Sequence, residues 1–295
     1  MRLSIPPGTE IKGKKNKYIV GNIVGISERS ITVLCRDDKN QKHRLKVFDG
    51  DSSINSQSYK FFAEVKTRGL LPLEDYGEIA GRPFYVYRNY NVQNVEQQII
   101  SIDLLVKRII PQISYVMNEV HSSRYLLRDI ATEHLLFDAN TSEIIYTGLS
   151  NFVKLQGKST AIKETGYGQH YSYIAPEVEQ YGYSLASDYF SLGVLLLSII
   201  KGRNVIQDIS RNAFIEGLKA GKVPGIDVAH LKNTPPDMYS NEDKVLYLIL
   251  GLMIPNPNQR WGYSEIKCWC NNQFIPLVRN GDRVNYQYSQ PLILR

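Results

Sequence analysis

The chain has 295 residues, of which 43 % are hydrophobic and 22 % charged, the composition of an ordinary globular protein in water. The net charge of +6 is modest and spread along the chain. Its densest basic stretch is a leader, residues 1–17, which we interpret as a solvated terminus and not as a nucleic-acid site. The longest apolar run, residues 192–200, is too short to span a membrane.

The cysteine content argues for a reducing compartment. There are three cysteines, an odd and sparse set that makes no disulfide framework. Cys268 and Cys270 form a C-x-C pair, but neither His nor Cys follows them, so we expect no metal there. Since the chain also opens without a signal peptide, we expect a cytoplasmic protein.

The first third of the chain has the pattern of β-strands. We expect strands near residues 18–24, 30–36, 43–48, 70–76 and 82–90. A helix is expected at residues 56–68, because Phe61, Phe62 and Val65 recur on one side of it. Residues 18–90 are therefore predicted to form a first unit of five strands and one helix.

Helical periodicity dominates from residue 91. Apolar residues recur at three- and four-residue steps from Ile102 to Val120, and Pro111 is predicted to kink this helix or mark a boundary. Residues 187–200 are apolar on all sides, which indicates a buried helix, and further helices are expected at 241–253 and 263–270. The second unit is thus residues 91–270. A tail, 271–295, carries an Asn280-Gly281 turn signal that is typical of a hairpin. Ligands commonly bind in clefts between two such units.

The run R-L-K-V-F at residues 44–48 resembles the V-A-I-K strand of protein kinases. The resemblance implies an α+β, bilobal protein kinase-like fold, with a five-stranded antiparallel N-lobe carrying one helix and a mainly helical C-lobe. It also implies that Lys46 contacts the phosphates of ATP and that Glu64 is its ion-pair partner. Of the family's glycine-rich loop, G-x-G-x-x-G, only Gly25 is present, so few backbone N–H groups can approach a phosphate closely.

The run L-R-D-I at residues 127–130 resembles the H-R-D catalytic loop. It places Asp129 where the family has its catalytic base. Ala131 replaces the usual lysine, and His134 replaces the asparagine that binds a second magnesium ion. Imidazole is a poor ligand for magnesium. We favour a His134 that is hydrogen-bonded within the loop over one with a metal or catalytic role.

Residues 146–150, Y-T-G-L-S, resemble the D-F-G segment. Tyr146 then occupies the position of the magnesium-binding Asp. A phenol is neutral at pH 7 and cannot replace a carboxylate at the metal. We also expect its bulk to project toward the phosphate site. The donor set therefore argues against magnesium, while ATP remains a candidate ligand.

Other matches concern residues that hold the family's C-lobe together. Y-I-A-P-E ends at Glu177, S-D-Y-F-S-L-G-V contains Asp188, and N-P-N-Q-R ends at Arg260. The resemblance implies a buried Arg260–Glu177 ion pair and an Asp188 that accepts hydrogen bonds from the catalytic-loop backbone. It also places Arg128 where it could meet a phosphate in the activation segment, residues 148–177. We favour the alternative that this segment is a constitutively ordered, tyrosine-rich patch.

Three functions stay open at this point. The first, which we favour, is a pseudokinase: a kinase-shaped binding or regulatory module with a protein partner and metal-independent contact with ATP or another nucleotide. The second is an active, atypical serine/threonine kinase, which Lys46, Glu64 and Asp129 support. The third is another nucleotide-dependent transferase on the same fold. The composition is more typical of a bacterial or viral member of the family than of an animal one.

Overall fold

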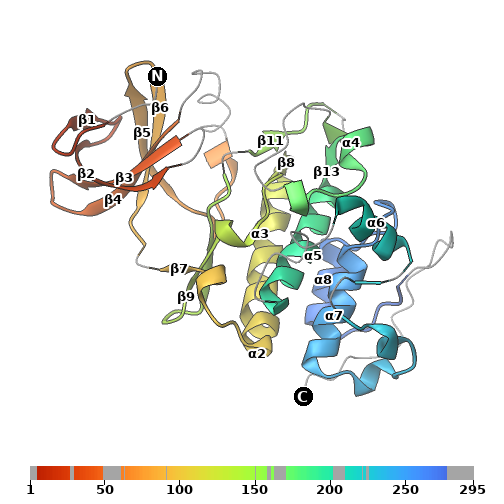
Figure 1. Ribbon diagram of the computed structural model, residues 1–295. Coiled ribbons are helices and arrows are strands. Elements are labelled where there is room, and N and C mark those ends of the chain that lie inside the picture. The colour runs from red at the N-terminus through yellow and green to blue at the C-terminus, as the bar shows by residue number, and fades with distance from the viewer. Residues whose placement is uncertain are drawn as a thin grey trace. The chain divides into compact units, whose positions relative to one another are not determined.

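The computed structural model describes residues 5–26, 30–48, 61–62, 64–90, 92–149, 151–157, 161–162, 171–201, 210–220, 222–223 and 226–277. The chain divides into two compact units (Figure 1). Unit 1 comprises Met1–Lys66 and Leu70–Asn91, and unit 2 comprises Thr67–Gly69 and Val92–Arg295. Strands dominate unit 1 and helices dominate unit 2, so the α+β class expected from the sequence is confirmed.

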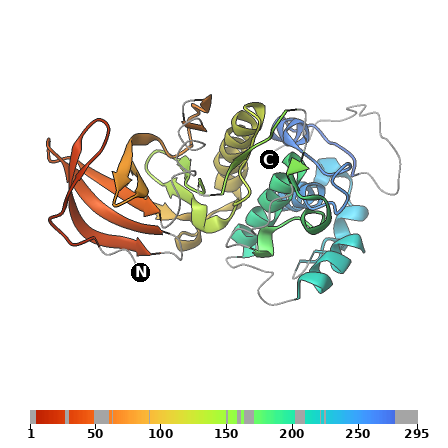
Figure 2. The same cartoon turned by 90° about the horizontal axis from the view of Figure 1, so that it is seen from above.

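Unit 1 contains one curved antiparallel sheet with the strand order β1-β2-β3-β4-β6-β5 (Figure 2). Its strands are β1 (Glu10–Lys12), β2 (Lys17–Ile26), β3 (Ser30–Asp37), β4 (Lys42–Phe48), β5 (Leu73–Ile79) and β6 (Arg82–Arg88). Alternate residues of neighbouring strands, such as Val33, Leu45 and Val86, are fully buried on one face. This alternation builds a single core for the unit.

The sheet has six strands instead of the expected five, because the basic leader supplies β1. Glu10 pairs with Ile19 and Lys12 with Lys17 across the β1–β2 ladder. Ile5 and Ile11, also from the leader, belong to the apolar core. The basic side chains hid this strand from sequence analysis, since a three-residue strand shows little alternation.

A buried carboxylate fastens the leader to β5. Asp75 is 0 % exposed and accepts hydrogen bonds from the backbone N–H groups of Lys15 and Asn16 and from the hydroxyl of Tyr18, at 2.9–3.1 Å. At Gly13 a side chain is excluded by space, because a Cβ atom would lie 2.2 Å from Asp75 Oδ2. The carboxylate therefore replaces water for backbone groups that have no partner in a strand.

Two sequence expectations fall largely outside the described residues. Of the helix expected at residues 56–68, only Phe61, Phe62 and Glu64 are described as helical. The tail beyond residue 277, with its expected hairpin, and residues 27–29 between β2 and β3 lie outside the description.

Unit 2 is built around helices. Its longer ones are α3 (Ile110–Ser122), α5 (Leu185–Lys201), α6 (Arg211–Lys219), α7 (Asn241–Leu252) and α8 (Tyr263–Cys270). Its shorter helical segments are η1 (Val95–Gln97), α2 (Ile102–Leu104), η2 (Leu105–Ile109), η3 (Thr132–His134), η4 (Tyr171–Tyr173), α4 (Val178–Tyr181), η5 (Ala229–Lys232) and η6 (Pro236–Met238). Its strands are β7 (Gln93–Asn94), β8 (Tyr125–Leu126), β9 (Leu135–Asp138), β10 (Glu143–Tyr146), β11 (Val153–Lys154), β12 (Ala161–Ile162) and β13 (Tyr183–Ser184).

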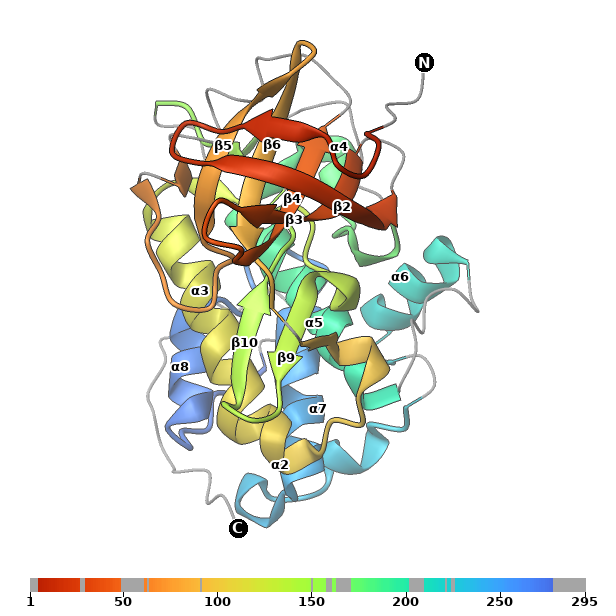
Figure 3. The ribbon, with the colours of Figure 1, turned by 90° about the vertical axis from the view of Figure 1, so that its left-hand side faces the viewer.

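Helix α5 is buried on every side from Ser187 to Ser198, as its uniformly apolar sequence predicts. It packs closely on α7: a Cβ atom at Gly193 would lie only 2.6 Å from Met253 Cγ. Strands β9 and β10 form a hairpin beside α3 (Figure 3). Tyr146 at the end of β10 and Asp188 in the first turn of α5 both lie in the core of unit 2.

The helical chain continues past Pro111, but its type changes there from a π-helix to α3, so the boundary expected at this proline is confirmed. The helical chain runs from Ile102 to Ser122, and the turn before the proline is a π-helix, Leu105–Ile109, in which the N–H of Ile110 bonds to the carbonyl of Leu105. Proline has no N–H and its ring collides with the carbonyl four residues earlier. The wider π turn accommodates both effects.

No helix among the described residues is long and apolar enough to cross a membrane.

Helix α7 begins with a capping box, and His230 makes an additional contact with its acidic residue, Asp243. Ser240 Oγ accepts the N–H of Asp243, and Asp243 Oδ2 accepts the N–H of Ser240. His230 Nε2 lies 2.7 Å from the other carboxylate oxygen, Oδ1. This contact raises the pKa of His230 above 6.5, and it helps to lower the pKa of Asp243 against the opposing effect of burial.

Replacing Asp75 with alanine leaves the buried Tyr18 hydroxyl and the partly buried N–H groups of Lys15 and Asn16 without this acceptor, so we expect Asp75→Ala to lower the free energy of unfolding by about 3 kcal/mol. Urea denaturation followed by circular dichroism measures the change. Glu78→Ala, an exposed position on the same strand, serves as the control and should change stability little. Equal midpoints for the two variants would contradict the role of Asp75.

The His230–Asp243 contact should make stability depend on pH. A raised folded-state pKa means that the contribution of His230 is fully present below pH 6.5 and is lost as the pH rises through the folded-state value. We therefore expect His230→Gln to be less stable than the unaltered chain at about pH 5.5 and equal to it at about pH 9. Urea midpoints across this range test the sign, and a difference that grows toward alkaline pH would contradict it.

Candidate functional site

The loop after β8 is held by a carboxylate from α5. Asp188 is 1 % exposed, and it accepts the N–H groups of Leu127 at 2.8 Å and Arg128 at 2.9 Å. His121 Nε2 lies 2.9 Å from the same carboxylate. Arg128 has a φ of 62°, a conformation that costs energy for a residue other than glycine. The three contacts offset that cost and set the direction in which the next residue, Asp129, leaves the loop.

Asp129 lies at the centre of a small polar cluster. Its side chain is 4 % exposed, and its Oδ2 atom lies 3.0 Å from His134 Nε2 and accepts a hydrogen bond of 2.8 Å from Asn151 Nδ2. His134 is thus hydrogen-bonded within the loop, the arrangement that we favoured on sequence grounds. Sequence analysis did not find Asn151, since a lone Asn two residues beyond the G-L pair has no recognisable spacing to Asp129.

Tyr146 ends β10 and is wholly buried. Its N–H bonds to Gly69 at 2.7 Å, and its hydroxyl donates to the carbonyls of Asp129 at 2.8 Å and Gly148 at 3.1 Å. Burial, followed by the charges of Asp129 and Asp188, raises the pKa of the phenol well above 10. The expectation that Tyr146 projects toward a phosphate site is wrong, because two carbonyl acceptors and the surrounding core draw the ring inward.

Gly148 fits only because it has no side chain. A Cβ atom there would lie 2.3 Å from Tyr146 Oη and 2.8 Å from the carbonyl oxygen of Asp129. Thr147 bonds through its N–H to the carbonyl of His134 at 2.8 Å. The segment from Tyr146 to Gly148 is therefore packed directly against the loop that carries Asp129 and His134.

Glu177 and Arg260 form a buried, bidentate ion pair. Arg260 Nη1 and Nη2 lie 2.6 Å and 2.9 Å from the two carboxylate oxygens of Glu177. The guanidinium also donates to the carbonyls of Ile254, Pro255 and Ala186 and lies over the ring of Phe190. A buried charge pair of this geometry has its donors satisfied, which makes it a structural contact of the helical unit.

Arg128 stacks on an aromatic ring. Its guanidinium carbon lies 4.5 Å from the centre of the Tyr183 ring. The resemblance places Arg128 where it could meet a phosphate, but residues 158–160 and 163–170 of the activation segment are outside the described chain. Contact between Arg128 and a phosphorylated residue therefore stays a prediction.

The remaining candidates belong to unit 1. Gly25 pairs with Thr32 in the β2–β3 ladder, and a Cβ atom at Gly25 would meet only ordinary contacts. Lys46 Nζ lies 5.2 Å from the centre of the Phe48 ring on β4. Glu64 is exposed. A role for these three residues in nucleotide binding stays a prediction.

The two positions that correspond to metal ligands do not fit magnesium. The Tyr146 hydroxyl is neutral, buried and engaged with backbone carbonyls. His134 presents a nitrogen, whereas magnesium prefers oxygen ligands in a tight octahedron. Within the described part of the chain, no three His, Cys, Asp or Glu side chains are grouped so as to hold a metal ion.

Comparison with known proteins gives consistent results. The family model described as "Protein kinase domain" matches residues 85–274, more than half of the chain. The receptor-like serine/threonine-protein kinase NCRK of Arabidopsis thaliana is 34 % identical over 112 residues, which are 37 % of this chain and 20 % of that protein. The serine/threonine-protein kinase sid1 of Schizosaccharomyces pombe is 23 % identical over 256 residues, which are 86 % of this chain and 49 % of that protein. The chain thus spans half or less of the length of these relatives.

Solved structures show the same fold. The autoinhibited serine kinase domain of the giant muscle protein titin superposes with a TM-score of 0.67 at 16 % sequence identity. The superposition covers 86 % of this chain and 79 % of that one. At this identity the likeness concerns the fold alone, and it confirms the kinase-like fold expected from the sequence.

Because a Cβ atom at position 148 collides with both Tyr146 and the Asp129 carbonyl, we expect Gly148→Ala to lower the free energy of unfolding by about 2–3 kcal/mol. Thermal or urea unfolding measures it. Gly217→Ala is the matched control: it lies inside helix α6 and its Cβ would meet only the Lys222 carbonyl at 3.8 Å. That variant should be unchanged or more stable by up to about 1 kcal/mol, since alanine favours a helix. Equal losses for both would contradict the packing described.

Proposed function

This chain belongs to the protein kinase family, and from that premise we propose that it is a pseudokinase, a kinase-fold binding or regulatory module without metal-dependent phosphoryl transfer. One observation carries the proposal. The residue at the position of the family's magnesium-binding carboxylate, Tyr146, is wholly buried, and its hydroxyl donates to two backbone carbonyls.

Phosphoryl transfer depends on positioning and on charge stabilisation, and metal ions supply much of both. The chain replaces two metal-ligating side chains with Tyr146 and His134, and the phosphate-steadying lysine with Ala131, which is 1 % exposed. Each of these replacements removes a metal ligand or a positive charge that phosphoryl transfer uses in the family. Their combination supports loss of the transfer step more strongly than any one of them.

The contacts of Asp129 support the same conclusion. His134 and Asn151 both bond to its Oδ2 atom and would compete there with the hydroxyl of a substrate. A catalytic base has to accept a proton from that hydroxyl at hydrogen-bond distance. We propose that the cluster of Asp129, His134 and Asn151 stabilises the loop in place of catalysing a reaction.

Nucleotide contact without a metal remains part of the proposal. Lys46 retains the ammonium that pairs with phosphates in the family, so ATP or another nucleotide is the proposed ligand. A module of this kind acts through a protein partner. The sparse cysteines support a reducing compartment such as the cytoplasm.

An active serine/threonine kinase is the second candidate, because one observation favours it. Asp188 fixes the loop that carries Asp129 by accepting the N–H groups of Leu127 and Arg128, as a working base would require. The two candidates differ in whether magnesium and ATP together produce transfer.

The test is a thermal-shift titration of the full chain with ATP, with and without magnesium, combined with mass spectrometry for phosphate incorporation into the chain and a generic peptide. We expect ATP to stabilise the chain equally with and without magnesium, and no phosphate to be incorporated. Lys46→Met should abolish the ATP-dependent shift. Magnesium-dependent stabilisation together with incorporation that Asp129→Asn abolishes would overturn the proposal in favour of the active kinase.

A further inference from the structure

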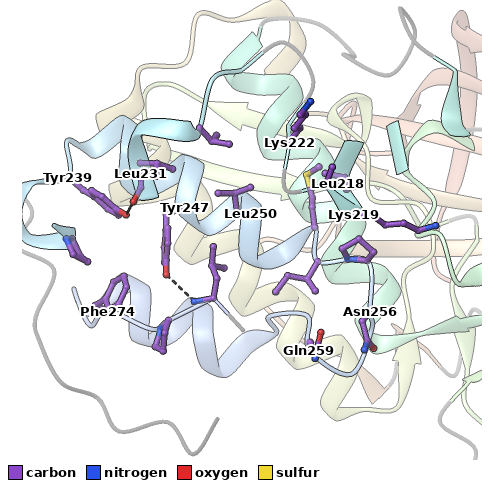
Figure 4. A pocket seen from close by; sticks show the side chains of 18 of the residues that line it. Leu218, Lys219, Lys222, Leu231, Tyr239, Tyr247, Leu250, Asn256, Gln259 and Phe274 are labelled. Atoms are coloured by element: carbon purple, nitrogen blue, oxygen red, sulfur yellow. Dashed lines mark hydrogen bonds between the residues drawn. The ribbon is translucent and has the colours of Figure 1, made fainter. Parts of the chain in front are cut away.

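Unit 2 carries a groove of about 770 Å³ that lies apart from the Asp129 cluster (Figure 4). Its walls come from the end of α6, from residues 228–239, from α7 and the turn after it, and from residues 274–277 beyond α8. None of its lining residues belongs to the segment 125–151 that contains Asp129, His134 and Tyr146. A space of this size holds several side chains or one small ligand.

The walls of the groove are built by two tyrosines whose hydroxyls face the protein. Tyr239 donates to the carbonyl of Leu231 at 2.6 Å. Tyr247 donates to the carbonyl of Ile275 and accepts the N–H of Leu277, both at 3.0 Å. The ring of Phe274 stacks on that of Tyr247 at 5.3 Å. With the hydroxyls engaged and the rings buried, the tyrosines fix this wall of the groove before any ligand arrives.

The groove is lined mainly by apolar residues, and the charged residues that line it are basic. Its apolar lining residues are Leu218, Ala220, Val228, Leu231, Pro236, Leu250, Met253, Ile254, Pro255, Phe274, Pro276 and Leu277. Among the described residues, the charged ones that line it are Lys219 and Lys222, and none of them is acidic. Figure 4 shows the two lysines on one side of the groove and Tyr239 and Phe274 on the other.

The lysine end is exposed to water. Lys219 and Lys222 are both exposed, and Lys219 Nζ lies 2.7 Å from Glu216, an exposed residue one turn earlier in α6 that does not line the groove. An ion pair between exposed groups is weak, so a ligand carboxylate can replace it at little cost. Two lysines beside an apolar floor attract a ligand that has an apolar body and an acidic end.

We propose that this groove docks a short segment of a partner protein in which large apolar residues are followed by acidic residues. The apolar side chains pack on Leu250 and Phe274, and the acidic residues meet Lys219 and Lys222. The inference rests on the proposed function as a binding module and gives it a partner chemistry. A row of separate apolar anchors beside a charged end suits an extended or helical peptide.

The test uses fluorescence anisotropy of the full chain with labelled twelve-residue peptides that carry Leu-Leu-x-Phe followed by three Glu. Peptides with Gln in place of Glu test the charge. We expect the acidic peptides to bind at least about tenfold more tightly than the Gln peptides. This difference in affinity should become smaller at higher salt concentration, because salt screens the attraction between the charges.

Two variants test the groove itself. Lys219→Glu combined with Lys222→Glu should weaken acidic-peptide binding by about tenfold. Leu250→Gln, at a half-buried position of α7, should weaken binding of both peptides by about tenfold. The matched control is Lys107→Glu combined with Arg108→Glu, two exposed basic residues on another helix of unit 2, and it should bind like the unaltered chain.

Other occupants give results that overturn the proposal. Peptide binding that appears only after Leu292, Ile293 and Leu294 are replaced with serine would assign the groove to this chain's own tail. Saturable binding of dodecanoate without peptide binding would assign it to a small amphiphile, and no binding of any probe would remove the site. All variants are assayed for the ATP-dependent thermal shift as well, so that a failure here is distinguishable from a failure of the pseudokinase proposal.

Discussion

The carboxylate of Asp188 is the contact on which the rest of the site depends. It extends from the first turn of α5, a helix buried from Ser187 to Ser198, and accepts two backbone N–H groups of the loop that carries Asp129. Without it those donors would be buried without partners, and the left-handed Arg128 would have nothing to offset its strain. His121 bonds to the same carboxylate, so α3, α5 and the loop are tied together at one point. The path of the chain into Asp129 follows from this arrangement.

The departures from the family's motif support one another. Tyr146 fills the space that a metal-ligating carboxylate would leave open, and its hydroxyl satisfies the carbonyls of Asp129 and Gly148. Gly148 must then remain glycine, because a methyl group would collide with the phenol. His134 turns its nitrogen to Asp129. A segment that coordinates metal in the family is packed and hydrogen-bonded here, which is the main support for the pseudokinase proposal.

Much of this site could be predicted from sequence because the contacts join residues at recognisable motifs. The Arg260–Glu177 pair and the loop contacts of Asp188 were expected from motif matches, and the structure contains both. Asn151 was missed because nothing in its neighbourhood fixes a distance to Asp129. The buried orientation of the Tyr146 ring was also missed, because it depends on the carbonyl groups of Asp129 and Gly148, which accept its hydroxyl.

The sequence by itself determined a strand-rich first unit, a helix-rich second unit, the burial of α5 and the family, since these depend on periodicity and on spaced motifs within single segments. Only the tertiary structure decided that the basic leader joins the sheet, because that depends on Asp75, some sixty residues away, accepting the leader's N–H groups. It also decided that a π turn precedes Pro111 in its helix. Finally, it decided that four segments separated in the sequence line an apolar groove with lysines at one end. The physical reason is the same in each case. Backbone donors and apolar surfaces are satisfied by residues far away in the sequence, and local sequence patterns do not indicate which distant residues will be close in space.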